Sequence, residues 1–171
     1  MFPENDITST ELAVKILEES DNLTAFNCDR NDTMELNVFI HSEAIQYQKE
    51  KLGITHLFLY DNHIIGFATL AMSDVEIKEA PSLLSFKPNI RDYPVLLIGR
   101  LAVHNDYRGR NVGKIICLFC LDTAKRISKE IGCKLVVVQT EENLVGFYEK
   151  CGFQLFPKHK SKKKWMYVQV P

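Results

Sequence analysis

The stretch Val95-Leu96-Leu97-Ile98-Gly99-Arg100-Leu101-Ala102-Val103 decides the fold of this 171-residue chain. Its almost continuous apolar run predicts a buried strand. A polar loop, His104 to Asn111, follows, and the next segment, Gly113 to Ile131, is expected to be a helix. The apolar side chains on one face of that helix are Ile116, Cys120, Ala124, Ile127 and Ile131. A strand, a polar loop and the N-terminus of a helix form the arrangement that binds phosphate groups.

The loop between this strand and this helix has the sequence Tyr107-Arg108-Gly109-Arg110-Asn111-Val112-Gly113-Lys114. Small residues and residues that tolerate positive φ allow successive backbone N–H groups to converge, and the helix N-terminus adds positive potential. The sequence matches neither G-x-x-x-x-G-K-[ST] nor G-x-G-x-x-G. Taken alone, the loop is either a phosphate cradle or a basic surface turn.

Strands and helices alternate on the C-terminal side of this helix. Lys134 to Thr140 is a buried type of strand, and Asn143 to Cys151 is a short helix that ends at Gly152. Two further strands are expected, Phe153 to Phe156 and Trp165 to Val170, with a lysine-rich turn between them.

The N-terminal half predicts a helix and a hairpin. An amphipathic helix is expected over residues 33–50, with Asp32 or Thr33 as its cap and Gly53 as its stop. A β-hairpin pairs 54–60 with 64–72 across an Asp-Asn-His turn. Residues 12–17 are a short strand or helix, and 79–94 form a long loop. The fold expected is a mixed α/β sheet with helices on both faces, in one domain spanning 1–171.

Composition and charge exclude several classes of protein. Hydrophobic residues make up 46 % of the chain and charged residues 25 %, which is ordinary for a globular domain. No apolar run approaches the roughly 18 residues that span a bilayer, and the N-terminal residues do not form a secretory signal. We therefore expect a cytoplasmic protein without membrane contact. The first 43 residues hold ten acidic and two basic side chains, which form either a solvated surface or a field that steers a charged partner.

The five cysteines do not indicate a metal site. Cys117 and Cys120 have C-x2-C spacing, but they lie within the expected helix, and no second pair accompanies them. Free buried thiols are the expected state, and no metal is expected.

Two blocks of the sequence together resemble the GNAT superfamily of acetyl-CoA-dependent N-acetyltransferases. The first is the Leu-Ala-Val strand with its Arg-Gly-x-x-x-Gly loop, within Leu96 to Lys114. The second is Asn143-Leu144-Val145-Gly146-Phe147-Tyr148-Glu149-Lys150-Cys151-Gly152-Phe153. The resemblance covers about residues 54–156. It implies a GNAT fold, with a mixed, mostly antiparallel and twisted sheet, and an acetyltransferase that moves the acetyl group of acetyl-CoA directly to a primary amine.

The resemblance also implies roles for individual residues. The strand residues Leu101, Ala102 and Val103 would bind the acetyl carbonyl and the pantetheine arm through their backbone. Asn143 matches a position that contacts the cofactor arm, and Tyr148 matches the tyrosine that protonates the departing thiolate. The pyrophosphate loop, acting through main-chain N–H groups, would comprise Arg108, Gly109, Arg110, Asn111, Val112, Gly113 and Lys114.

The chain departs from the family pattern at two points. Asn111 stands where the first loop glycine belongs, and asparagine is the residue that best replaces glycine at positive φ. Gly99-Arg100 precede Leu101 on the strand that carries a Glu base in many members. Without that carboxylate, an α-amine of pKa about 7.7–8.0 is a better acceptor than a lysine of pKa about 10.4. A non-catalytic acyl-CoA sensor is the alternative that also fits these departures.

Further segments resemble the toxin-like branch, whose members acetylate the α-amine of aminoacyl-tRNA. They are Ala25-Phe26-Asn27-Cys28-Asp29 and Tyr93 to Val103. The five lysines between Lys158 and Lys164 form either a contact for a phosphate backbone or a solvated turn. The acceptor is therefore a small molecule, a peptide or aminoacyl-tRNA. The family often forms homodimers, and an antitoxin-like partner is another option.

Overall fold

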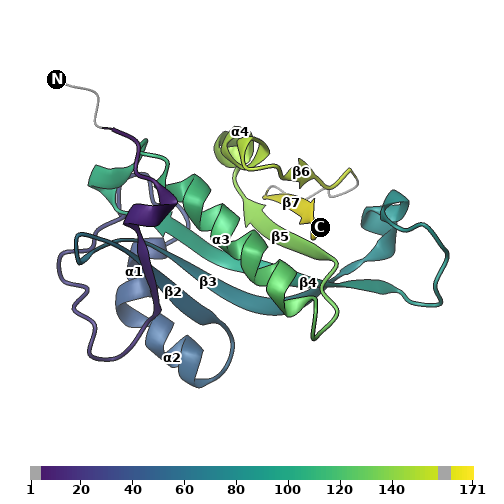
Figure 1. The fold of residues 1–171 in the computed structure, drawn as a ribbon, viewed down its shortest axis with the longest axis horizontal. Coiled ribbons are helices and arrows are strands. Elements are labelled where there is room, and N and C mark those ends of the chain that lie inside the picture. Colours follow the sequence, from purple (N-terminus) through teal and green to yellow (C-terminus); the bar gives the residue numbers. More distant parts are fainter. Residues whose placement is uncertain (1–4, 158–162) are drawn as a thin grey trace. The chain divides into compact units, whose positions relative to one another are not determined.

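The computed structural model describes residues 5–157 and 163–171. Within these ranges seven strands form a mixed sheet with the order β1-β2-β3-β4-β5-β7-β6 (Figure 1). The pairing of β4 with β5 is parallel, whereas β1–β2, β2–β3, β5–β7 and β6–β7 are antiparallel. The strands are β1 (Ala13–Ile16), β2 (Ile54–Tyr60), β3 (His63–Glu76), β4 (Asp92–Val103), β5 (Leu135–Thr140), β6 (Gln154–Leu155) and β7 (Lys164–Gln169). The predicted mixed, mostly antiparallel sheet is confirmed.

Four α-helices accompany the strands in the described residues. They are α1 (Leu36–Ser42), α2 (Ala44–Lys49), α3 (Val112–Ile127) and α4 (Val145–Lys150). The residues group into two compact units. Unit 1 comprises the chain up to Ala71 together with Gly99–Phe119, and unit 2 comprises Met72–Ile98 and Cys120–Pro171. The elements β3, β4 and α3 each contribute residues to both units. The single domain over 1–171 stays a prediction.

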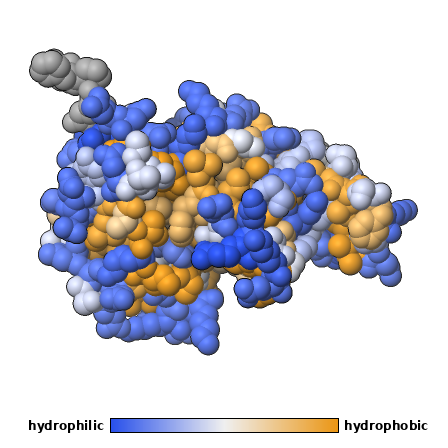
Figure 2. Space-filling view, viewed as in Figure 1, coloured by the Kyte–Doolittle hydropathy of each residue, from blue (hydrophilic) through white to orange (hydrophobic). Residues whose placement is uncertain are grey.

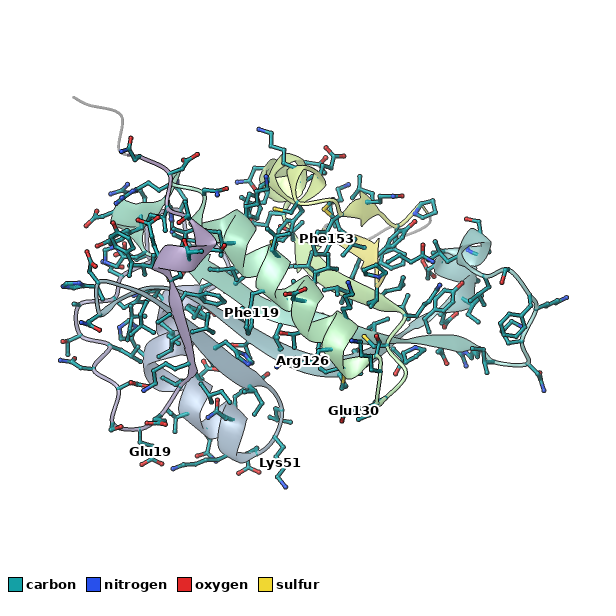
Figure 3. All side chains as sticks on the ribbon, in the orientation of Figure 1. Glu19, Lys51, Phe119, Arg126, Glu130 and Phe153 are labelled. Atoms are coloured by element: carbon teal, nitrogen blue, oxygen red, sulfur yellow. The ribbon has the colours of Figure 1, made fainter. Side chains whose placement is uncertain are left out.

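The hairpin of β2 and β3 organises unit 1. Its turn consists of Asp61 and Asn62, whose φ values of 46° and 61° suit residues that tolerate the left-handed region. Successive strand residues face opposite sides of a sheet. Leu57 packs with α1 and α2 in one core cluster, whereas the ring of the next residue, Phe58, lies 5.2 Å from the ring of Phe119. Phe119 belongs to α3 and is labelled in Figure 3. In unit 1, helices therefore cover both faces of the hairpin, as predicted.

The helix predicted over 33–50 is two helices, so the predicted continuous span was wrong. Glu35 has φ 57°, which delays the start to Leu36, and Glu43 has φ −120°, which separates α1 from α2. The helical hydrogen-bond pattern nevertheless continues past the break, since the Tyr47 N–H donates to the Glu43 carbonyl at 2.9 Å. The apolar residues of α1 and α2 therefore keep the spacing of one amphipathic helix. Of the two predicted caps, Asp32 bonds to the start of the helix with its side chain, although Glu35 occupies the N-cap position. The two carboxylate oxygens of Asp32 accept N–H bonds from residues 36 and 37, at 2.8 and 2.7 Å.

Gly53 does not end this helical segment as predicted. The left-handed residue after α2 is Lys51, with φ 58°. Gly53 is buried because it lies against β3, where a Cβ would come within 2.9 Å of the Thr69 side chain. Close approach of two chain segments, rather than helix termination, explains the glycine at this position.

In unit 2, β5 pairs with the first half of β4 in the register Val95↔Leu135 to Ile98↔Val138. Its other edge pairs with β7. A cluster of buried residues that includes Tyr93, Val95 and Val137 forms the core of this unit. Gly152, with φ 91°, follows α4 in the predicted terminating position.

The long loop predicted over 79–94 is shorter than expected. Two 3₁₀ turns, Ile77–Glu79 and Pro81–Leu83, precede β4, which already begins at Asp92. Pro94 therefore lies inside a strand. Its side chain is exposed, and its carbonyl still takes part in the strand contacts by accepting a bond from the Lys134 N–H at 2.7 Å.

Other boundaries differ in detail. The helix expected over Gly113 to Ile131 is α3, which ends at Ile127. Ile131 is 64 % exposed rather than on the buried face. Residues 12–17 contain the strand β1. None of the five cysteines, all of which lie in the described ranges, forms a disulfide, and four of them are buried as expected, whereas Cys151 is only partly buried. Apolar side chains also reach the visible face of the molecule among charged ones (Figure 2).

Gly66 provides a test of the packing in unit 1. An added Cβ would lie 2.8 Å from Cδ1 of buried Ile116 and 3.1 Å from the carbonyl oxygen of Ala102. Gly66→Ala should therefore lower the stability by about 1–3 kcal/mol, because a tightly packed core resists an added methyl group. At about 2–4 °C per kcal/mol, thermal unfolding should show a loss of several degrees.

Gly146 is the matched control. It lies in α4, and a Cβ there meets nothing within 4 Å, so Gly146→Ala should keep or raise the melting temperature. An unchanged melting temperature for Gly66→Ala would contradict the packing described here.

Candidate active site

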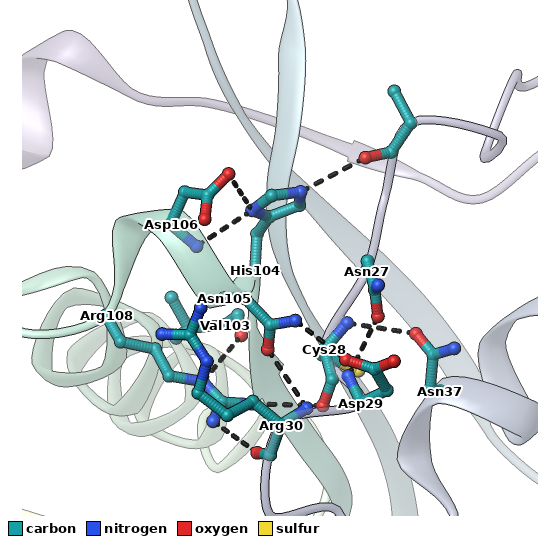
Figure 4. A network of polar contacts seen from close by, with 11 residues as sticks. Asn27, Cys28, Asp29, Arg30, Asn37, Val103, His104, Asn105, Asp106 and Arg108 are labelled. Atoms are coloured by element: carbon teal, nitrogen blue, oxygen red, sulfur yellow. Dashed lines mark hydrogen bonds and ion pairs between the residues drawn. The ribbon is translucent and has the colours of Figure 1, made fainter.

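Arg108 anchors the loop between β4 and α3. Its guanidinium donates to the backbone carbonyls of Arg30, Cys28 and Val103, at 2.5, 3.0 and 3.3 Å (Figure 4). The side chain therefore ties the segment 28–30 to the end of β4. Three of its five N–H donors are used in these bonds, so the backbone N–H of Arg108 is the donor that we expect a phosphate to meet, which is the mode that the sequence predicted.

Asn105 reinforces this connection. Its backbone N–H donates to the Asn27 carbonyl at 2.8 Å, and its side-chain amide donates to the Asp29 carboxylate at 2.8 Å. The same amide oxygen accepts a bond from the Arg30 N–H at 3.2 Å. The hydrogen bond from Asn105 lowers the pKa of Asp29. The segment 27–30 and the loop thus form one hydrogen-bonded assembly within unit 1 (Figure 4).

His104 is also part of this assembly. Its Nδ1 accepts the N–H of Asp106 at 3.1 Å, so the ring proton lies on Nε2, which donates to the Ala25 carbonyl at 3.1 Å. The ring packs at 5.7 Å against Phe26 and 5.6 Å against Tyr107. Because its lone pair is already used, His104 is a structural residue of the loop rather than a base for a substrate.

The backbone of the loop has the conformation that its glycine and asparagine suggest. Gly109 and Asn111 have φ values of 78° and 70°. The Ile115 N–H donates to the Asn111 carbonyl at 3.2 Å, so the amides of residues 112–114 precede the helical hydrogen-bond ladder of α3. Backbone N–H groups at such a helix start attract anions.

The side chains of the loop differ in their surroundings. Val112 is 1 % exposed and belongs to the core, whereas Lys114 is exposed. The Arg110 guanidinium lies 5.4 Å from the centre of the Tyr107 ring and 5.8 Å from that of Tyr60. Of the strand residues preceding the loop, Ala102 is buried in the unit 1 core, and Leu101 and Val103 are partly buried.

Arg100 is a feature whose surroundings the sequence did not reveal. On β4, its guanidinium lies 4.3 Å from the centre of the Phe39 ring and 5.4 Å from that of Tyr47, so it stacks on α1 and α2. The only signal for it in the sequence is a charged residue inside an apolar strand. No acidic residue occurs in β4 between Gly99 and Val103, so this part of the strand offers no carboxylate base.

The remaining predicted site residues lie in unit 2. Tyr148 is 5 % exposed, and its ring lies 5.0 Å from the Phe147 ring and 5.5 Å from the Phe153 ring, labelled in Figure 3. Asn143 is exposed in the 3₁₀ turn Glu142–Leu144 that follows β5. The structure thus brings residues 101–103 and 108–114 together in unit 1, and places Asn143 and Tyr148 in unit 2.

Thiol and metal chemistry find little support in the described residues. Burial raises the pKa of Cys28 and of Cys120 to about 12, which keeps both thiols protonated. Residues 5–157 and 163–171 contain no group of three His, Cys, Asp or Glu side chains that could hold a metal ion. None of their helices is long and apolar enough to cross a membrane.

Sequence comparison identifies relatives over most of the chain. The sequence model described as "Acetyltransferase (GNAT) family" matches residues 19–153. A tRNA-acetylating toxin of Mycobacterium tuberculosis (strain ATCC 25618 / H37Rv) is 22 % identical over 147 residues, which cover 85 % of this chain and 86 % of the toxin. Glucosamine 6-phosphate N-acetyltransferase 1 of Dictyostelium discoideum is 37 % identical over 54 residues, 32 % of each protein.

Solved structures show the same fold. AtaT complexed with acetyl-methionyl-tRNAfMet has a TM-score of 0.82 at 19 % identity, covering 92 % of this chain and 94 % of that one. AtaTR bound with AcCoA has a TM-score of 0.77 at 20 % identity, covering 94 % of this chain and 95 % of that one. Because the family match extends over most of the sequence, this chain belongs to the GNAT family and is an acetyl-CoA-dependent N-acetyltransferase.

Proposed function

We propose that the acceptor of this acetyltransferase is the α-amine of an aminoacyl-tRNA. The observation that carries the proposal is the match to the tRNA-acetylating toxin, which spans 85 % of this chain and 86 % of the toxin. The likeness to AtaT complexed with acetyl-methionyl-tRNAfMet is in line with it. The match to the glucosamine 6-phosphate enzyme covers only 32 % of each protein, so it supports a small sugar amine less well.

The loop after β4 is proposed to bind the pyrophosphate of acetyl-CoA. Residues 108–114 would contribute backbone N–H groups, which the positive φ of Gly109 and Asn111 and the start of α3 direct toward one region. The backbone of residues 101–103 would bind the acetyl and pantetheine groups, and Asn143 would contact the cofactor arm. Asn111 stands where the family has a glycine, yet it adopts the positive φ that a glycine would have there. This departure from the family pattern is therefore weaker support for a non-catalytic sensor.

The missing carboxylate on β4 favours an α-amine. With a pKa of about 7.7–8.0, roughly a third of an α-amine is neutral at pH 7.5, against about 0.1 % of a lysine side chain with a pKa near 10.4. Only the neutral form attacks a thioester. An α-amine therefore needs little help from a base. Without a base, the reactive neutral fraction of a lysine side chain would be several hundred times smaller than that of an α-amine.

Tyr148 is proposed to protonate the thiolate of CoA as it leaves. In the reaction, the amine nitrogen forms a bond to the acetyl carbon and gives up one proton to water, the bond from carbon to sulfur breaks, and a phenol supplies a proton to sulfur and regains one from solvent. The rings of Phe147 and Phe153 hold Tyr148 in a buried position. Such packing limits its side-chain rotation and excludes bulk water.

RNA and an antitoxin-like protein are the partners proposed for this chain. The lysines proposed for the RNA backbone fall largely in 158–162, outside the described residues. Of the two that are described, Lys164 already pairs with Glu142 at 2.9 Å, so it would add little. AtaT is known bound to the C-terminus of the antitoxin AtaR, and a comparable partner is proposed here. A homodimer and a cytoplasmic location stay predictions.

The substrate test compares acceptors at equal concentration. Release of CoA thiol from acetyl-CoA should be fastest with aminoacylated tRNA, and should fall to background with the same tRNA after deacylation, because the α-amine is then absent. A lysine peptide and a polyamine serve as further acceptors. Faster release with either of them than with charged tRNA would overturn the proposal.

The cofactor loop is tested by ligand-dependent melting. Acetyl-CoA at 100 times its Kd should raise stability by about 2.7 kcal/mol, which is roughly 5–11 °C for a chain of this size. Gly113→Val should abolish this rise, because a β-branched side chain at the helix start blocks the approach of phosphate oxygens. Asn111→Gly is the control. It keeps the positive φ and should keep the rise, so an equal rise in Gly113→Val would place the cofactor elsewhere.

Tyr148→Phe tests the general acid. The substitution keeps the ring and its packing and removes the proton donor, so the rate with charged tRNA should fall about 10²- to 10⁴-fold. Stability should change by no more than about 1 kcal/mol. Tyr167→Phe, which removes a hydroxyl 3.5 Å from the Gln154 side chain, should keep the rate. A Tyr148→Phe enzyme that works at the wild-type rate would make this tyrosine a packing residue.

A further inference from the structure

Unit 2 contains a pocket that shares no residue with the candidate site. It encloses about 250 Å³ and is lined by the end of β3, by the turn after it, and by residues of β5, β7 and the segment after β6. The lining residues are Ser73, Asp74, Val75, Glu76, Glu79, Val137, Phe156 and Trp165. At about 30 Å³ per water molecule, the volume suits a group the size of one amino acid rather than a large ligand.

Glu79 gives this pocket an unsatisfied acceptor. Its Oε2 is buried and has no hydrogen-bond partner among the described residues. Leaving a buried carboxylate oxygen without a donor is costly, because the oxygen has lost its water and gained nothing in return. A bound cation with N–H groups would supply the missing hydrogen-bond donor.

The basic side chains beside the pocket are already engaged. Glu76 accepts Lys78 at 2.5 Å and Arg91 at 2.7 Å, and these contacts lower the pKa of Glu76. Arg91 also lies 3.9 Å from the Asp92 carboxylate. Neither cation is bonded to Glu79. Lys78 interacts with Glu79, and Arg91 with Asp74, through longer-range electrostatics, so the buried oxygen of Glu79 still lacks a hydrogen-bond donor.

The other side of the lining is aromatic and apolar. Phe156 is 6 % exposed and packs at 4.6 Å against the Tyr167 ring, and Trp165 and Val137 complete this wall. Aromatic faces attract organic cations, and carboxylates form strong charge-assisted bonds with ammonium groups. A metal ion fits less well, because no three acidic, histidine or cysteine side chains in the described ranges converge as a metal site.

We propose that this pocket binds a primary ammonium group attached to an apolar group, with Glu79 accepting its N–H bonds and Phe156 and Trp165 contacting the apolar part. Two sources carry this chemistry. One is the aminoacyl end of the acceptor, held as an ammonium before it loses its proton and reacts, in which case the site rests on the proposed function, and the other is a free polyamine. Binding to the isolated protein requires neither acetyl-CoA nor tRNA.

Trp165 makes the pocket directly observable, because it is the single tryptophan of the chain. Titration with leucinamide should produce a saturable change in tryptophan fluorescence, whereas N-acetyl-leucinamide, which has no charge, should produce none. Spermidine is titrated in parallel. Saturation by leucinamide alone identifies the aminoacyl end as the ligand, and saturation by spermidine alone identifies a polyamine. If neither saturates the signal, or if the neutral analogue binds equally well, the proposal is overturned.

Glu79→Gln tests the acceptor atom. This substitution keeps the shape and removes the charge, and it should weaken binding of the positive ligand by tenfold or more. Glu130→Gln makes the same charge change at an exposed position outside the pocket and should leave binding unchanged. The melting temperature of Glu79→Gln should stay equal or rise, because the substitution removes the charge from a group with a buried oxygen that has no hydrogen-bond partner. Unchanged affinity in folded Glu79→Gln would overturn the proposal, whatever the enzyme acetylates.

Discussion

The three hydrogen bonds from the Arg108 guanidinium to backbone carbonyls are the contact on which the candidate site of unit 1 depends. They join Arg108 to Cys28 and Arg30, which lie 80 and 78 positions earlier in the sequence, and to Val103 at the end of β4. A planar guanidinium has five donors in a fixed geometry, so one side chain can bridge several carbonyls that a lysine could not satisfy together. The segment 28–30 and the proposed cofactor loop are therefore fixed by the same residue. Asn105 and His104 add bonds to the same two segments.

This arrangement explains which parts of the fold the sequence could predict. The hairpin, the Asp32 cap and the Gly152 stop depend on signals within a few residues, and each is found where it was expected. The early start of β4 depends on pairing with a distant segment, since Pro94 and Val95 bond to or pair with residues 134 and 135. Periodicity does not record such pairing. The prediction that Gly53 ends the helix was wrong for the same reason, since the residue that Gly53 packs against, Thr69, is 16 positions away in the sequence. The break at Glu43 is a single backbone distortion that leaves the apolar spacing unchanged.

The candidate site shows the same division. The sequence from Val95 to Lys114 predicted a strand, a loop with residues suited to positive φ, and a helix. The positive φ values of Gly109 and Asn111 agree with this prediction. The side-chain partners of Arg108 and the aromatic rings beneath Arg100 could not be read, because each comes from another part of the chain. The pocket around Glu79 combines residues from four separate segments. None of them carries a local motif, so no sequence pattern could have revealed it.

Asn111 illustrates how a departure from a family pattern can be accommodated. A glycine would reach φ 70° without strain but would offer no side chain. Asparagine reaches the same φ at modest cost, and its amide lies 3.5 Å from the Ile7 carbonyl, while the Ile7 N–H donates to the neighbouring Arg110 carbonyl at 3.0 Å. Ile7 itself is 1 % exposed. Compared with glycine, asparagine at position 111 therefore has less backbone freedom but connects the N-terminal segment to the loop. A loop held in place at Cys28, Arg30 and Ile7 has little conformational entropy left to lose when a ligand binds its backbone amides.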